Sequence, residues 1–212
     1  MLPSGQPKFR RRKAARPDEI VAAALEIFSE KGFAAARLDD IAARAGVSKG
    51  AIYLYFATKE DIFRAVIAQA VLPNVGQIRQ LAAAHPGPFS DLARGLAALA
   101  PTLLARSELG GVIKMVVGEA RNFPEIARMW HDQVIDPALG ALSEAIGAAQ
   151  ARGEVRPGDP RLYALGLIGP LLAGVIWRET FTPVGAEPFD LPTLARQHFE
   201  TALRGMSPDP TA

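Results

Sequence analysis

Residues 45–56, AGVSKGAIYLYF, combine a serine, a lysine and two tyrosines within one short segment. Ammonium and hydroxyl groups donate hydrogen bonds to phosphate oxygens, so this composition suits contact with a polyanion. Ser48 is a preferred helix N-cap residue, and a helix that begins after it would present free N–H groups to a phosphate. We therefore predict a short helix over residues 49–56 that lies against a groove of DNA.

The predicted DNA contacts lie on the outward face of that helix and beside it. With Ile52 and Phe56 directed inward, an ideal helix presents the residues between them on its opposite side. Hydroxyl groups there would bond to phosphates, and apolar side chains would touch thymine methyl groups. The predicted contacts are Arg37, Ser48, Lys49, Gly50, Ala51, Tyr53, Leu54, Tyr55 and Lys59. A purely structural role, in which the tyrosines wedge helices together, stays open.

The preceding segment has the residues that a helix–turn–helix requires. We expect a helix over residues 38–45, followed by a turn over residues 46–48. Gly46 tolerates the positive φ that such a turn needs, and Ala42 is small enough to permit a steep helix crossing. Helix pairs of this kind also occur in proteins with no DNA role, so the pattern favours DNA binding without requiring it.

Two flanking helices and a basic arm complete this part of the chain. Pro17 predicts the start of a first helix that ends at Gly32, and Thr58 predicts the cap of a fourth, with Asp61 completing a capping box. Residues 1–16 are expected to be disordered. Their basic run could contact the DNA backbone or minor groove, or could be only a solvated tail; it consists of Arg10, Arg11, Arg12 and Lys13.

Charge is unevenly distributed along the 212 residues. Residues 1–64 hold twelve Lys and Arg against eight Asp and Glu, whereas residues 65–212 hold twelve against fourteen. A basic front part is typical of proteins that meet a polyanion, and chance together with a solvated tail is the alternative. The chain has no cysteine, which excludes disulfides and thiolate metal sites.

From about residue 74 the chain is rich in Ala, Leu and Gly at helical spacing. The expected fold class is all-α. A DNA-binding domain is expected over residues 17–64, a helical ligand-binding and dimerisation domain over residues 65–205, and a disordered tail over residues 206–212. Helices are expected near residues 74–84, 89–105, 107–121, 123–151, 160–181 and 190–204. Prolines should kink or split them, at Pro73, Pro101, Pro137 and Pro170. Asp136 and Pro137 could equally be the cap and the first residue of a restarted helix.

The segment over residues 160–181 is apolar nearly all round, which predicts burial on more than one side. With residues 190–204 it would form a four-helix bundle with a second copy of the chain; burial within one subunit is the alternative. Its longest apolar run, residues 162–177, is interrupted by glycines and a proline and falls short of the ~20 residues that a membrane span needs. We therefore expect no membrane contact and a cytoplasmic location.

A ligand pocket is expected in the second domain, because ligand sites favour the spaces between bundle helices. A largely apolar small molecule is the expected ligand, and no metal or cofactor is expected. The candidate lining residues are Met115, Glu119, Trp130, His131, Val134 and Trp177. Each of them could equally be an ordinary core or surface residue.

The segment over residues 16–66 resembles the amino-terminal domain of the TetR family of bacterial transcription regulators. The similarity is carried by IA..AGVSKG, by the Y.YF run of Tyr53, Tyr55 and Phe56, and by the KE that follows. It implies a two-fold dimer on double-stranded operator DNA, with one recognition helix per subunit and a carboxy-terminal domain that binds an inducer. Arg37 stands where the family usually has a phosphate-holding threonine. An arginine can contact phosphate more strongly, but its longer reach leaves the contact point open.

The second domain resembles, more loosely, the AefR-like branch of that family, through FPE at residues 123–125 and the pair Trp130-His131. The predicted function is a ligand-responsive repressor that a small molecule releases from its operator. An activator of the same fold and a non-specific DNA-binding protein are the alternatives. Common motifs of nucleophilic, phosphate-binding and metal-dependent catalysis do not occur in the sequence, so an enzyme is not expected.

Overall fold

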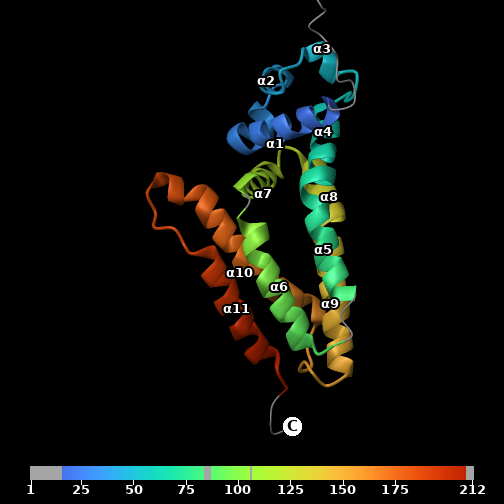
Figure 1. The fold of residues 1–212 in the computed structure, drawn as a ribbon, viewed down its shortest axis with the longest axis vertical. Coiled ribbons are helices and arrows are strands. Elements are labelled where there is room, and N and C mark those ends of the chain that lie inside the picture. The colour runs from blue at the N-terminus through green and yellow to red at the C-terminus, as the bar shows by residue number, and fades with distance from the viewer. Residues whose placement is uncertain (1–15, 84–86, 106, 209–212) are drawn as a thin grey trace, which may run out of the picture.

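The computed structural model describes residues 16–83, 87–105 and 107–208, and the predicted basic run over residues 10–13 lies outside them. The described residues form helices and turns without a strand, which confirms the all-α prediction. Four helices occupy one end of an elongated molecule, and longer helices form the remainder, here called the body (Figure 1). The four are α1 (Arg16–Ala35), α2 (Leu38–Arg44), α3 (Lys49–Ile52) and α4 (Lys59–Val66).

Local sequence sets the limits of these first helices. Gly32, with φ of 77° and ψ of 169°, is non-helical and ends the long first run of α1, as predicted; a short helical segment follows it to Ala35. Gly46 has the expected positive φ, 65°, in the turn after α2. The capping box is confirmed: Thr58 Oγ1 accepts the Asp61 N–H and Thr58 N–H donates to the Asp61 carboxylate, each at 3.1 Å.

Three phenylalanines hold this end together. The rings of Phe28, Phe33 and Phe63 have centroids 5.4 to 5.9 Å apart, and two of the three pairs have the edge-to-face geometry that aromatic quadrupoles favour. All three are fully buried, as are Ile41 and Ile52 of the helix–turn–helix. The apolar side of the helix–turn–helix is therefore fixed against α1 and α4, which leaves its other side in solvent.

No linker separates α4 from the body. Helical turns continue through η1 (Ile67–Val71) into α5 (Leu72–Ala83). The η1 segment is a π-helical turn that ends two residues before Pro73. Proline lacks an N–H and its ring clashes with the carbonyl four residues earlier, and the wider π turn accommodates this conflict without ending the helix.

The same arrangement recurs before Pro137. Here α8 (Pro124–Trp130) passes through a second π turn, η2 (His131–Ile135), into α9 (Asp136–Ala151). The predicted helical segment over residues 123–151 thus has nearly the right extent, and it is divided before Pro137, where α9 begins at Asp136 with the proline in its first turn.

The remaining helices of the body are α6 (Phe89–Leu104), α7 (Ser107–Glu119), α10 (Pro160–Thr180) and α11 (Leu191–Met206), with the short η3 (Thr182–Val184) after α10. A second hydrophobic core lies among α6, α9, α10 and α11. Met206 is buried and its carbonyl accepts the Arg156 N–H at 2.9 Å. The predicted disordered tail over residues 206–212 therefore begins too early.

His198 of α11 compensates for the proline inside α10. Pro170 has no N–H, so the Gly166 carbonyl four residues earlier loses its helical donor. His198 Nε2 lies 3.0 Å from that carbonyl oxygen and 3.2 Å from the Leu167 oxygen, so Nε2 carries the proton and donates. This contact lets α10 continue past Pro170 and ties α11 to it.

Close contacts between α1 and α7 join the two parts of the molecule. A Cβ atom on Gly111 would lie 2.6 Å from the Cβ of Ser29, so only glycine fits there without a shift. The Glu119 carboxylate accepts the Ala34 N–H, with its two oxygens 3.0 and 2.9 Å away. Glu119 therefore fixes the end of α1 to α7.

Within the described residues, one helical stretch is long and apolar enough to cross a membrane. It covers Pro160–Val184, 25 residues, and its most apolar 18-residue window has a mean hydropathy of 1.4. The prediction that this segment is too short is therefore wrong, because the helix extends beyond the apolar run over residues 162–177. Core helices of soluble proteins meet the same criterion, and α10 packs against α7, α9 and α11.

Candidate functional site

Ser48 begins α3 as its N-cap. Its Oγ accepts the Ala51 N–H at 3.2 Å, as predicted. However, α3 is a single turn, Lys49–Ile52, whereas the sequence predicted a helix as far as Phe56.

Between the end of α3 at Ile52 and Thr58, the N-cap of α4, the chain forms a turn. The N–H groups of Tyr55 and Phe56 both donate to the Ile52 carbonyl, at 2.9 and 3.0 Å, so a helix-like turn follows α3. Thr58 is then extended, as its capping role requires. The consequence is a compact, protruding turn in place of a longer recognition helix.

The residues around this turn divide into an exposed and a buried set. Leu54 is 78% exposed, Tyr53 54% and Tyr55 37%. Also exposed are Ser48, Lys49 and Gly50. Ala51 is only 7% exposed, so the prediction that it lies on the outward face and touches a thymine methyl group is wrong.

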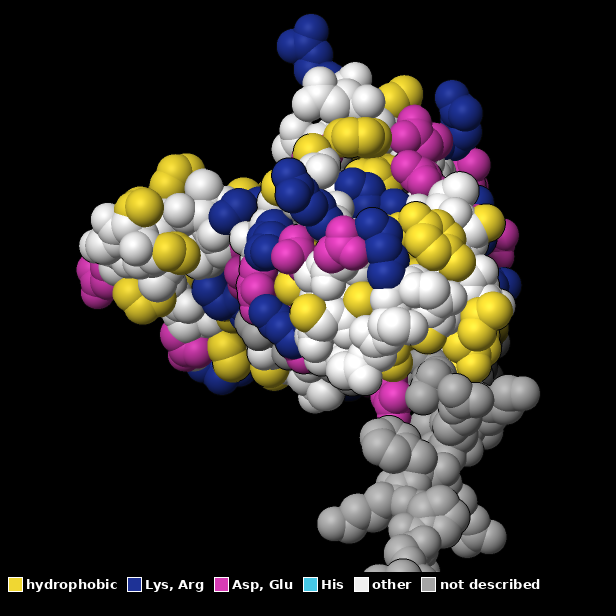
Figure 2. Space-filling model, turned by 90° about the horizontal axis from the view of Figure 1, so that it is seen from above, with side chains coloured by type: hydrophobic (Ala, Val, Ile, Leu, Met, Phe, Trp, Pro, Cys, Tyr) yellow, Lys and Arg dark blue, Asp and Glu magenta, His cyan; other side chains and the backbone are white. Residues whose placement is uncertain are grey.

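Positive and negative side chains are intermixed over this end of the molecule (Figure 2). The Lys49 ammonium lies 2.9 Å from the Asp39 carboxylate, and this hydrogen bond raises the pKa of the lysine. Arg44 is bound on two sides, by Glu26 at 2.6 Å and by Glu30 at 2.9 Å. Much of the positive charge of the described helices is therefore matched by carboxylates.

Arg37 differs from these residues. It is the exposed N-cap residue of α2, and its side chain makes no capping hydrogen bond. No carboxylate of the described residues lies within ion-pair distance of it. Its guanidinium is therefore directly available to a phosphate.

Lys59 has a structural role that the sequence did not predict. Its ammonium donates to the carbonyls of Phe33, Ala34 and Ala36, at 2.5, 3.3 and 3.1 Å. It also lies 4.4 Å from the centroid of the Phe33 ring. Burial lowers the pKa of this ammonium. Because its three protons are used at the end of α1, the structure argues against the predicted phosphate contact.

A cavity of about 410 Å³ lies in the body, between α5, α6, α7, α8, α9, α10 and α11. Its walls are almost entirely hydrocarbon. Trp130 and Val134, both buried, are the two predicted lining residues that contribute to it. A volume of this size falls within the range of small-molecule sites.

The structure places the other four predicted lining residues elsewhere. Met115 is buried in the core that contains the three phenylalanines, and Glu119 holds the Ala34 N–H. His131 is exposed, with Nδ1 2.8 Å from the Asp132 carboxylate. Trp177 donates its indole N–H to the Glu187 carbonyl at 3.0 Å and stacks against neighbouring aromatic rings.

Sequence reasoning missed Asn74, a polar residue in the cavity wall. It lies on α5 between the apolar lining residues Val71, Val75 and Ile78. An asparagine inside an otherwise apolar helical stripe, directly after a proline, is the signal that could have identified it.

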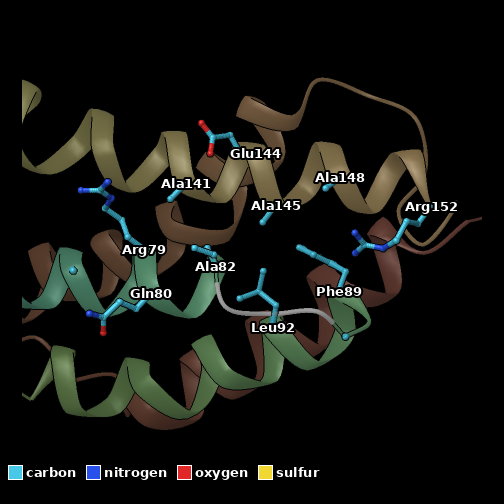
Figure 3. A pocket seen from close by; sticks show the side chains of 13 residues that line it. Arg79, Gln80, Ala82, Phe89, Leu92, Ala141, Glu144, Ala145, Ala148 and Arg152 are labelled. Carbon is cyan, nitrogen blue, oxygen red and sulfur yellow. The ribbon is translucent and has the colours of Figure 1, made fainter.

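A second, more open hollow of about 660 Å³ lies between α5, α6 and α9, away from the helix–turn–helix. Ala141, Ala145 and Ala148 form one wall, and the charged ends of Arg79 and Glu144 point away from the space (Figure 3). Arg152, at its edge, is held by Glu154 at 2.6 Å. The described residues contain no cluster of His, Asp and Glu side chains suited to a metal ion.

Two family models match the chain. The model described as bacterial regulatory proteins, tetR family, covers residues 20–66. The model described as tetracyclin repressor-like, C-terminal domain, covers residues 89–190. Neither match bears on the looser resemblance to the AefR-like branch.

Individual relatives include both a repressor and an activator. The HTH-type transcriptional repressor BepR of Brucella suis is 31% identical over 156 residues, which is 69% of this chain and 73% of BepR. The HTH-type transcriptional activator FasR of Mycolicibacterium smegmatis is 40% identical over 65 residues, 31% of this chain and 30% of FasR.

Among solved structures, SmeT is similar over nearly its whole length. SmeT is the repressor of the Stenotrophomonas maltophilia multidrug efflux pump SmeDEF, and it matches with a TM-score of 0.71 and 22% identity over 94% of each chain. Its complex with triclosan gives a TM-score of 0.73 and 24% identity, over 93% of this chain and 94% of SmeT. At this identity the likeness concerns the fold.

Proposed function

Because the chain belongs to the TetR family of bacterial transcription regulators, we propose that it is a repressor that leaves its operator when a small molecule binds its body. It is a DNA-binding regulator with an amino-terminal helix–turn–helix and a helical carboxy-terminal domain. One observation carries the proposal: an exposed helix–turn–helix and an apolar cavity are joined by a continuous helix.

The exposed turn around α3 is the proposed major-groove element. Tyr53 and Leu54 extend furthest into solvent and would contact bases and nearby phosphates. Arg37 would bind a phosphate directly. Lys49 would exchange Asp39 for a phosphate, which costs little because exposed ion pairs contribute about 0–1 kcal/mol. Ser48, Gly50 and Tyr55 stay in the proposed contact set, whereas Ala51 and Lys59 leave it.

Dimerisation through α10 and α11 is the second part of the proposal. Leu162 and Leu165 of α10 are 67% and 52% exposed, and Gly166 and Ala173 on the same helix are exposed as well. Only 22% of the most apolar window of this stretch is buried within one chain. Pairing with a second copy would remove this apolar surface from water and would place two helix–turn–helix units on one operator.

The cavity is the proposed inducer site. Its walls are hydrocarbon apart from the Asn74 amide and the Trp130 indole N–H, which favours a largely apolar ligand. SmeT, whose fold is similar, has been solved in complex with triclosan. We propose that this chain also binds a small molecule in its body, without assuming the same one.

Ligand and DNA would be coupled through shared helices. Val71 and Asn74 line the cavity, and the same helical run leads back through η1 to Thr58 at the edge of the helix–turn–helix. A ligand that alters the course of this run would favour one spacing of the two DNA-binding units over another. A cytoplasmic location follows from the proposal, since the operator is chromosomal DNA.

Fluorescence anisotropy tests the proposal directly. A labelled duplex from immediately upstream of the gene for this chain is compared with a scrambled duplex at physiological salt. We expect the upstream duplex to bind about 10³-fold more tightly. Equal, weak and salt-sensitive binding to both duplexes would favour the non-specific DNA-binding alternative.

A promoter–reporter assay separates repression from activation. FasR, an activator, is similar to this chain over the helix–turn–helix, so this alternative has a specific basis. Deleting the gene should raise reporter output if the chain represses, and lower it if the chain activates.

A further inference from the structure

The cavity in the body has one amide in its wall. Asn74 is 8% exposed and is the only buried polar or charged residue among those that the structure describes. The other side chains that line the cavity are aliphatic or aromatic, and of these only Trp130 carries a polar atom, its indole N–H. Burial of an amide costs free energy unless its donors and acceptor form hydrogen bonds. We therefore expect Asn74 to have a hydrogen-bond partner in the cavity.

One hydrogen bond fixes how the amide is turned. Asn74 Nδ2 lies 3.3 Å from the Ala70 carbonyl oxygen. A carbonyl only accepts, so the NH₂ end of the amide must face it and Oδ1 must point the other way. Oδ1 can accept two hydrogen bonds, yet no donor among the described residues is bonded to it.

The helix presents this acceptor to the ligand space. Val71, Asn74, Val75 and Ile78 all line the cavity, and their spacing of three, four and seven residues puts them on one face of the helix. Asn74 therefore occupies a position where an apolar residue would continue the wall.

We propose that the ligand of this cavity is an uncharged, mainly hydrocarbon molecule with one hydroxyl group, and that Asn74 Oδ1 accepts the hydrogen bond from that hydroxyl. This inference rests on the proposed ligand-responsive function, and it adds the ligand class and the residue that selects it. A carboxylate ligand is disfavoured, because the lining residues that the structure describes include no Lys, Arg or His to offset a buried negative charge. A pure hydrocarbon would leave Oδ1 without a donor.

A matched pair of probes isolates the hydroxyl group. We would measure the binding of 4-butylphenol and butylbenzene to the full chain by isothermal titration calorimetry, and take the ratio of the two dissociation constants. The two probes share one skeleton and differ only in the hydroxyl. Asn74→Leu keeps a side chain of similar size without the acceptor, and should reduce the preference for the phenol about tenfold, as one lost hydrogen bond implies.

Two control variants test whether Asn74 is the selecting residue. Ile113→Val trims the hydrocarbon wall elsewhere, so both probes should weaken together and their ratio should stay constant. Trp130→Phe removes the other polar atom and should also leave the ratio constant. The proposal is overturned if Asn74→Leu changes the ratio less than twofold, if Trp130→Phe abolishes the preference, or if neither probe binds the unaltered chain.

Operator binding distinguishes failure of this inference from failure of the proposed function. The unaltered chain should prefer the upstream duplex, and a urea midpoint close to that of the unaltered chain should show that Asn74→Leu is folded. Normal operator binding with an unchanged probe ratio would overturn only the assignment of Asn74. A shifted probe ratio in a chain that does not prefer the upstream duplex would support the cavity inference and overturn the operator proposal.

Discussion

The helix–turn–helix end and the cavity differ in whether their polar side chains have hydrogen-bond or ion-pair partners within the protein. At the helix–turn–helix end, polar side chains largely have partners within the protein: Lys49 has Asp39, Arg44 has two glutamates, and Lys59 has three carbonyls. In the cavity, the side-chain oxygen of Asn74, Oδ1, accepts no hydrogen bond from a described residue. The partnered surface is exposed to water, whereas the cavity wall is hydrocarbon.

This difference determines how selective each surface can be. An exposed ion pair is worth about 0–1 kcal/mol, so Lys49 can exchange Asp39 for a phosphate at small cost, and DNA affinity accumulates over many salt-sensitive contacts. A buried acceptor that is left without a hydrogen bond costs about 1–3 kcal/mol. A single residue can therefore discriminate between ligands in the cavity, whereas on DNA several must act together.

The largest effect is expected where the two regions meet, at α1 and α7. Gly111→Ala would push a methyl group against Ser29 and should lower the free energy of unfolding by about 2 kcal/mol, the usual cost of overpacking. Gly118→Ala, on the same helix but with open space around it, should leave stability unchanged or raise it by about 0.5 kcal/mol. Urea unfolding measures both, and equal effects would contradict the close helix contact.

Lys59→Met comes next and tests the structural role of that lysine. Removing the ammonium leaves three carbonyls at the end of α1 without their donor, so the free energy of unfolding should fall by about 2 kcal/mol. Lys49→Met, at an exposed ion pair, should change stability by less than about 0.5 kcal/mol. Urea unfolding measures both changes in the free energy of unfolding. If Lys59→Met is as stable as the unaltered chain, the structural role of Lys59 is contradicted, and its ammonium becomes a candidate for the predicted phosphate contact again.

Features set by near neighbours in sequence could be predicted. The Ser48 cap, the positive φ of Gly46 and the capping box between Thr58 and Asp61 each depend on residues at most three apart. The same holds for the all-α class and for most helix limits, because apolar spacing and proline act locally. Helical spacing also placed Tyr53 and Leu54 on the exposed side of the helix–turn–helix, although it put the buried Ala51 there as well.

Features set by distant contacts could not be predicted. Lys59 binds carbonyls 23 to 26 residues away, and Glu119 reaches Ala34 across 85 residues. Trp177 was predicted to line the pocket, but its indole N–H donates to the carbonyl of Glu187, ten residues later in the chain. Seven α-helices contribute described residues to the cavity, so its lining depends on packing that no short segment encodes.

A smaller effect is expected for Arg37→Ala, on DNA binding only. The loss of one phosphate contact should weaken operator and scrambled DNA alike, and should lower the slope of log affinity against log salt by about one. Arg128→Ala removes an exposed arginine of α8, in the body, and should leave the slope unchanged. Anisotropy titrations at several salt concentrations would show this, and equal slopes for all three proteins would place Arg37 away from the DNA backbone.

The smallest effect is expected from pH, through the capping box of α4. The hydrogen bond with Thr58, followed by that with Arg64, holds the pKa of Asp61 below its ordinary value of 3.8. A carboxyl with a lowered folded-state pKa stabilises the fold above the unfolded-state pKa, and this contribution is lost as pH falls through the folded-state value. Asp61→Asn should therefore be less stable than the unaltered chain at pH 7, and the difference in urea midpoint should shrink as the pH falls below 4. A difference that stays constant with pH would mean that the Asp61 charge contributes nothing to the cap.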